Sequence, residues 1–204
     1  MVRKIGILAV CLMVLAASGT LEARGDDITP QESELACITM NTERLPLDGR
    51  RSPLDSVTFV LQTSPVKVCY GRPSARGRAI FGGLLPYDQL WRTGANEPTM
   101  IHTPIGLSIA GIAVGPGSYS IYSVPGESEW EIIVNRSTSQ WGHESSYESV
   151  RSQEVGRAKL KSEATDDHVE VFTIRATPNS DRDATLLLEW ERTRVAIPIT
   201  VGGA

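Results

Sequence analysis

Residues 56–70 read SVTFVLQTSPVKVCY, and this stretch decides the fold class. Apolar side chains recur at every second position in both halves, at Val57, Phe59 and Leu61 and again at Val66, Val68 and Tyr70. A period of two places successive side chains on opposite faces of an extended chain. The stretch therefore predicts two β-strands, each with one apolar face and one more polar face.

The same alternation returns along the rest of the chain. Further rows are Tyr119 and Ile121; Trp130, Ile132 and Val134; Val169 and Val171; Leu186, Leu188 and Trp190; and Val195, Ile197, Ile199 and Val201. Turn-forming glycines and prolines separate neighbouring rows, as at residues 115–117 and 125–126. Residues 145–157 form either one short helix or a loop. We predict an all-β fold, a single antiparallel β-sandwich with a barrel-like sheet as the alternative.

Composition places the chain among ordinary globular proteins. Its 204 residues are 41% hydrophobic and 22% charged, which is typical of one folded domain. The formal net charge of −4 does not favour a nucleic acid as partner. Three cysteines and three histidines leave little material for a metal cage, so we predict no metal and no cofactor.

The first residues have the pattern of a secretory signal peptide at residues 1–23. A positively charged start precedes an uncharged apolar run over residues 5–17, and small residues follow. Cleavage after Ser18, Gly19 or Ala23 fits this pattern. The run is shorter than the roughly 20 residues of a membrane-spanning helix, so no integral span is expected after its removal. We expect an exported protein, periplasmic or extracellular.

Two cysteines remain beyond the predicted signal peptide. Residues 24–51 are polar and turn-rich, and we predict a tail that lies on the surface or stays mobile, ahead of a β-sandwich domain at residues 52–204. Cys37 lies in this tail, and Cys69 lies opposite the apolar row of its strand. An oxidising compartment permits them to pair. A disulfide and two separate thiols both stay open, because spacing does not decide connectivity.

One long segment, residues 70–97, has neither the strand period nor the helix period. It contains five glycines and four arginines, namely Arg72, Arg76, Arg78 and Arg92. Residues 66–96 carry five basic residues and one acidic residue, although the whole protein is acidic. Arginine pairs readily with carboxylate and phosphate, so the segment is a candidate anion site. In the architectural alternative, the arginines bind the loop's own carbonyls and Trp91 packs into the core.

Three functions are compatible with this segment. In the leading hypothesis it binds an anionic small molecule or a glycan, with the arginines supplying charge, Asn96 and Glu97 polar groups, and Trp91 or Trp141 a flat wall. In the second, the protein is a hydrolase with Glu97 or His102 as the general acid or base. In the third, it is a structural envelope protein without a ligand site. The sequence does not decide whether the protein is an enzyme, or its oligomeric state.

The aperiodic segment also carries a family resemblance. It reads YGRPSARGR at 70–78, IFGGLLPY at 80–87 and WRTGANE at 91–97, which resembles the signature of a bacterial exported family called domain of unknown function 2911. The similarity extends over about residues 52–200. The resemblance implies small, exported, all-β proteins, and it carries over neither an activity nor a catalytic residue.

Overall fold

The computed structural model describes residues 35–202, so the predicted signal peptide and the first part of the predicted tail lie outside the described residues. The predicted all-β fold is confirmed. The strands are β1 (Leu54–Leu61), β2 (Ser64–Gly71), β3 (Thr99–Thr103), β4 (Leu107–Ile109), β5 (Ile112–Val114), β6 (Gly117–Pro125), β7 (Glu129–Asn135), β8 (Glu154–Pro178) and β9 (Asp183–Val201). No helix within the described range is long and apolar enough to cross a membrane.

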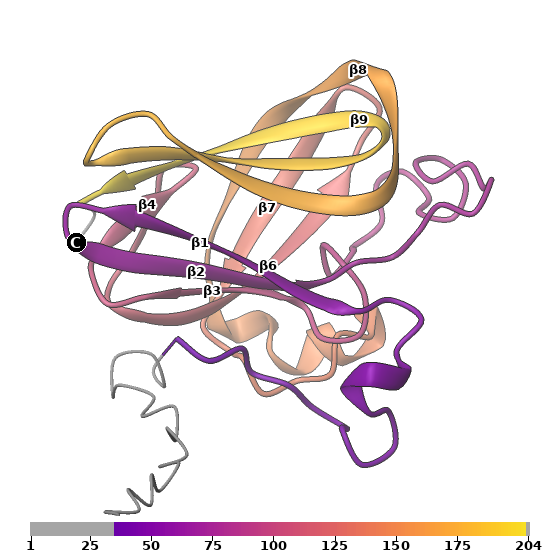
Figure 1. Cartoon of the computed structure of the whole chain (residues 1–204), viewed down its shortest axis with the longest axis horizontal. Coiled ribbons are helices and arrows are strands. Elements are labelled where there is room, and N and C mark those ends of the chain that lie inside the picture. Colours follow the sequence, from indigo (N-terminus) through magenta and orange to yellow (C-terminus); the bar gives the residue numbers. More distant parts are fainter. Residues whose placement is uncertain (1–34, 203–204) are drawn as a thin grey trace, which may run out of the picture.

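The nine strands form one antiparallel sheet in the order β1-β2-β3-β6-β7-β8-β9-β4-β5. The sheet folds over itself into two layers and is not closed into a barrel, so the architecture is sandwich-like (Figure 1). The long strand β8 makes this fold possible. Its residues 154–161 pair with β7, and its residues 162–178 pair with β9. One backbone therefore runs through both layers.

The apolar rows of the strands meet between the two layers. Val66 and Val68 of β2 are fully buried in the core, as are Ile132 and Val134 of β7. Burying such side chains stabilises the fold by about 1.5–3 kcal/mol each, relative to leaving them exposed. The alternation in the sequence therefore identifies the inner face of these strands correctly.

The row in β8 is an exception. Val169 and Val171 do share a face, but both are only partly buried, and Phe172 and Ile174 reach the core instead. The strand register shifts between Ala164 and Val169 and again before Thr173. Such irregularities exchange the face that a side chain occupies, because each extra residue reverses the alternation.

For residues 145–157 the sequence predicts either one short helix or a loop. This region contains two short 3₁₀ helices, η2 (Glu144–Ser149) and η3 (Arg151–Gln153). It lies against the outer side of the sheet. There Tyr147 packs its ring edge-on against Tyr122 of β6, with the ring centroids 4.5 Å apart. This contact gives the sandwich a second, smaller apolar cluster outside the main core.

The part of the predicted tail that the structure describes, residues 35–51, lies on the surface, and we call it the strap. In Figure 1 it is the indigo segment below β3, with the 3₁₀ helix η1 (Leu47–Gly49) near its end. A disulfide joins Cys37 of the strap to Cys69 of β2, with the Cα atoms 5.7 Å apart. Of the two alternatives for the cysteines, the structure has the disulfide.

Removal of this disulfide is expected to lower the free energy of unfolding by about 3–4 kcal/mol, because it closes a loop of 32 residues. The variant is Cys37→Ser with Cys69→Ser, measured by urea unfolding. Reductant should lower the stability of the wild-type protein to that of the variant and should not affect the variant. An unchanged urea midpoint would contradict the expected contribution of the disulfide.

Candidate functional site

The aperiodic segment leaves β2 at Gly71, returns to the sheet at Thr99, and extends beyond the two layers at the right of Figure 1. Two glycines fix its ends by close backbone contact. A Cβ atom at Gly71 would lie 2.0 Å from the carbonyl oxygen of Ala95, and one at Gly142 would lie 2.2 Å from that of Asn96. Only glycine allows these approaches, so the segment has a defined path.

Two of the predicted arginines hold neighbouring segments together. Arg72 forms an ion pair of 3.1 Å with Asp55 of β1, and its Nη2 donates to the hydroxyl of Thr173. Arg76 donates from Nη2 to the carbonyl oxygen of Arg51, at 3.2 Å. These partners lie outside the aperiodic segment, in β1, β8 and the strap, so the two arginines do not bind the loop's own carbonyls as the architectural alternative predicts.

The other two arginines reach one cleft. Arg78 donates from Nε and Nη2 to the carbonyl oxygens of Ala75 and Ser74, at 2.9 and 2.8 Å. Arg92 forms a bidentate pair with Glu144 of η2, with N–O distances of 3.0 and 2.9 Å. The contacts of Arg78 are those that the architectural alternative predicts, to carbonyls of its own loop. The four guanidinium groups do not share one partner, but Arg78 and Arg92 line the same space.

That cleft has a volume of about 610 Å³. Its lining consists of Ser52, Pro73, Arg78, Leu84, Leu85, Pro86, Gln89, Leu90, Trp91, Arg92, Gly94, Ala95, Asn96, Glu144 and Trp190. Most of these residues belong to the aperiodic segment. Of the predicted site residues, the lining contains Arg78, Trp91, Arg92 and Asn96. It does not contain Arg72, Arg76, Glu97, His102 or Trp141.

Trp91 is mainly a core residue. Only 3% of it is exposed, and its ring stacks on that of Trp190 with the centroids 5.9 Å apart. Its indole Nε1 donates to the carbonyl oxygen of Gly94. The residue contributes to the bottom of the cleft, but its faces are covered by other aromatic rings. Trp141 is half-buried and lies outside the lining.

Glu97 is buried under the strap. Its carboxylate accepts hydrogen bonds from Nη1 and Nη2 of Arg50, at 2.6 and 3.0 Å, and from the backbone N–H of Met40, at 2.6 Å. The side chains of Arg50 and Glu97 are 0% and 4% exposed. The neighbouring Asn96 donates from Nδ2 to the carbonyl oxygen of Ser52. Glu97 therefore fastens the strap to the segment that forms the cleft.

His102 of β3 lies apart from this cleft. Its Nδ1 is 2.8 Å from the hydroxyl oxygen of Ser118 on β6. Burial, together with the positive charge of Lys67, lowers the pKa of His102, so the ring is neutral at pH 7. It borders a separate cavity of about 400 Å³ whose lining shares no residue with the cleft.

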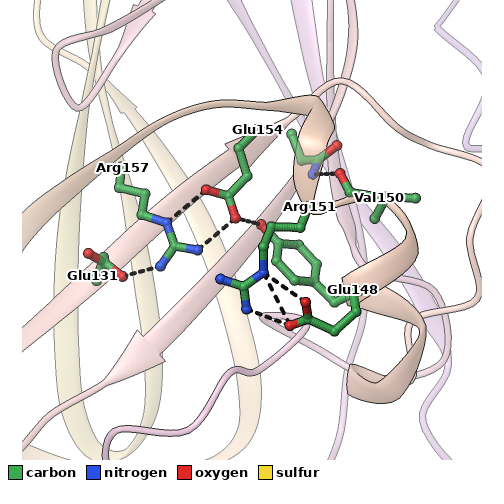
Figure 2. Close-up of polar contacts among 8 residues, drawn as sticks. Glu131, Glu148, Val150, Arg151, Glu154 and Arg157 are labelled. Carbon is green, nitrogen blue, oxygen red and sulfur yellow. Dashed lines mark hydrogen bonds and ion pairs between the residues drawn. The ribbon is translucent and has the colours of Figure 1, made fainter.

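Sequence reasoning missed a charged network on β7, η2, η3 and β8. Figure 2 shows Arg157 between Glu131 and Glu154, and Arg151 paired with Glu148. Arg157, with the burial of the carboxyl group opposing it, lowers the pKa of Glu154. The sequence contains a sign of two of these ion pairs, because Arg151 and Arg157 each follow a glutamate by three residues. Burial and a hydrogen bond to Glu154 raise the pKa of the Tyr147 phenol.

This network adjoins the cleft. It borders a smaller cavity of about 360 Å³, and Gln89, Leu90 and Glu144 line both spaces. Glu144 therefore stands between the arginines of the cleft and the network. Within residues 35–202, no group of three or more histidine, cysteine, aspartate or glutamate side chains is arranged to hold a metal ion.

Comparison with known proteins identifies the family. Residues 52–199 match the family described as "Protein of unknown function (DUF2911)". The chain belongs to this family. The DUF2911 region runs from just before β1 to near the end of β9 and contains the whole aperiodic segment, while the strap precedes it. No curated protein and no solved structure matches the chain.

Proposed function

We propose that this DUF2911 protein is an exported binding protein that holds a small anionic or carbohydrate-like ligand in the cleft of the aperiodic segment. The observation that carries the proposal is that Arg78 and Arg92 line one cleft of about 610 Å³. Concave sites with an apolar lining and a few oriented polar groups are typical of ligand binding.

Arg78 is the principal recognition residue in this proposal. Its side chain is exposed, and two carbonyl oxygens hold its Nε and Nη2. Its Nη1 has no hydrogen-bond acceptor within the described part of the chain. A guanidinium group that two hydrogen bonds already hold in place loses less conformational entropy when its remaining donor binds a ligand.

The rest of the lining restricts the ligand. Glu144 neutralises Arg92, so the cleft favours a ligand with one negative charge over a polyanion. Leu84 is 44% exposed, and it forms an apolar rim together with Pro86 and Leu90. A ligand with an acidic group and an apolar face therefore fits this lining best.

The hydrolase alternative has less support. Both oxygens of the Glu97 carboxylate are engaged by Arg50 and Met40, so this group is not free to take a proton from a substrate. His102 borders a different cavity. General acid–base catalysis needs its group within hydrogen-bond reach of the reacting atoms, and neither residue lines the cleft.

Substitution of Arg78 tests the proposal. A panel of small carboxylic acids, sugar acids and neutral sugars is screened against the purified protein by thermal shift, and hits are titrated by calorimetry. Arg78→Ala should weaken binding about 10- to 100-fold, because it removes a charge-assisted hydrogen bond. Arg76→Ala removes the same charge outside the cleft and should leave affinity unchanged. Equal losses in both variants, or a panel without hits, would refute the proposal.

Export is tested separately. When the protein is expressed with its first 23 residues, the mature form should start after Ser18, Gly19 or Ala23, as measured by intact mass. The disulfide supports this expectation, since such bonds persist in oxidising compartments. An unprocessed protein that stays in the cytoplasm with reduced cysteines would contradict it.

A further inference from the structure

We infer a second binding site, centred on His102 on the outer face of the sheet, that takes a compact carboxylate. This site goes beyond the proposed function, because its cavity shares no lining residue with the cleft. Residues of β3 and β6, their adjoining turns and Leu35 of the strap line the cavity, and β2 contributes Lys67 beside His102 without lining it.

The strand register brings the polar groups of this site together. His102 of β3 is directly paired with Lys67 of β2 on one side and with Ser118 of β6 on the other. Directly paired residues project from the same face of a sheet. The adjoining cavity of about 400 Å³ is lined by Leu35, His102, Thr103, Pro104, Pro116, Gly117 and Ser118.

His102 has an unmade hydrogen bond. The residue is only 1% exposed, and its Nε2 has no partner among residues 35–202. Leaving a buried polar atom unpaired costs about 1–3 kcal/mol, and native proteins contain few such atoms. A ligand that pairs with Nε2 removes this cost, so the atom marks a position where an external group is bound.

The surroundings of His102 indicate the chemistry of that group. When the Ser118 hydroxyl donates to Nδ1, the neutral ring carries its proton on Nε2 and requires an acceptor there. The adjacent ammonium group of Lys67 favours an acceptor with a negative charge. Pro104, Pro116 and Leu35 supply apolar walls for a short aliphatic chain. A small monocarboxylate meets all three conditions.

The same features argue against a nucleophilic role for Ser118. A base must accept the proton of the hydroxyl group, yet burial and Lys67 both disfavour the protonated form of His102. No carboxylate of the described residues contacts the ring to stabilise an imidazolium. The pair is therefore arranged for binding.

The Nε2 atom is inaccessible to solvent, so a ligand contacts it only after a neighbouring group moves. Leu35 of the strap lines the cavity, two residues before the disulfide at Cys37.

The test titrates sodium acetate and sodium propionate into the purified protein. We expect saturable shifts of the His102 ring signals in ¹H–¹⁵N spectra, and binding in calorimetry. Lys67→Met should weaken binding about tenfold, and His102→Phe should abolish it. Arg78→Ala removes a cation from the cleft and should have no effect here, which separates this site from the proposed function.

Acetamide, which keeps the carbonyl acceptor but lacks the charge, should bind at least about tenfold more weakly than acetate. Absence of saturable shifts would overturn the inference, and so would equal affinities for acetate and acetamide. Equal affinity in the wild-type protein and in Lys67→Met would also overturn it. Lys67→Met keeps the test decisive if His102→Phe does not fold, since Lys67 is only partly buried.

Discussion

Glu97→Ala is expected to lower the free energy of unfolding by about 3–5 kcal/mol, because it breaks a buried ion pair. The substitution leaves the guanidinium of Arg50 buried without its counter-charge, and it also removes the acceptor of the Met40 N–H. Urea unfolding measures the loss. In thermal unfolding, each kcal/mol should correspond to about 2–4 °C for a chain of this size.

An exposed ion pair provides the matched control. Glu148 pairs with Arg151, and their side chains are 69% and 55% exposed. Because solvent screens such pairs, Glu148→Ala should cost less than about 1 kcal/mol. A similar cost for Glu97→Ala and Glu148→Ala would mean that the strap is not fastened through Glu97. The double variant Arg50→Leu with Glu97→Leu should recover part of the stability, because it leaves no unpaired charge.

Trp91→Ala is the second substitution with a large expected effect, a loss of about 3–5 kcal/mol in the free energy of unfolding. The indole packs edge-on against Trp130 and Phe172, with centroid distances of 5.9 and 5.1 Å. Its removal leaves a cavity where the aperiodic segment meets the core. Chemical unfolding, followed by the fluorescence of the remaining tryptophans, measures the loss.

Trp141→Ala is the control for this substitution, because Trp141 is half-buried and outside the main core cluster. It should destabilise the protein less than Trp91→Ala does. A Trp91→Ala variant that keeps its stability and loses ligand binding would support the flat-wall role instead of the core role. Trp91→Phe should lie between the two alanine variants in stability, since it keeps part of the aromatic contact.

The strands were predictable because their signal is local. Where a row such as Trp130, Ile132 and Val134 alternates without interruption, the inner face follows directly from the sequence. The same reasoning failed to identify the core residues of β8, because register shifts reverse the alternation near Val169. A period-two pattern does not predict the position of a β-bulge.

The site was predictable in composition and not in its contacts. The excess of arginine in residues 70–97 marked the segment that lines the cleft. The partners of these arginines come from far along the chain, as Glu144 does for Arg92, 52 residues away. The buried ion pair between Arg50 and Glu97 was missed for the same reason, because the polar composition of the strap does not indicate which of its residues is buried. Ion pairs between residues far apart in the chain depend on the folded topology, and local sequence patterns do not encode that topology.

The 25-residue strand β8 has a consequence for how the molecule resists force and heat. Because its two halves pair with β7 and β9, one continuous backbone carries hydrogen bonds of both layers. We therefore expect the two layers to unfold together, in one cooperative transition. Tension applied at the strap enters the sheet through Cys69 of β2, a strand that pairs with β1 and β3.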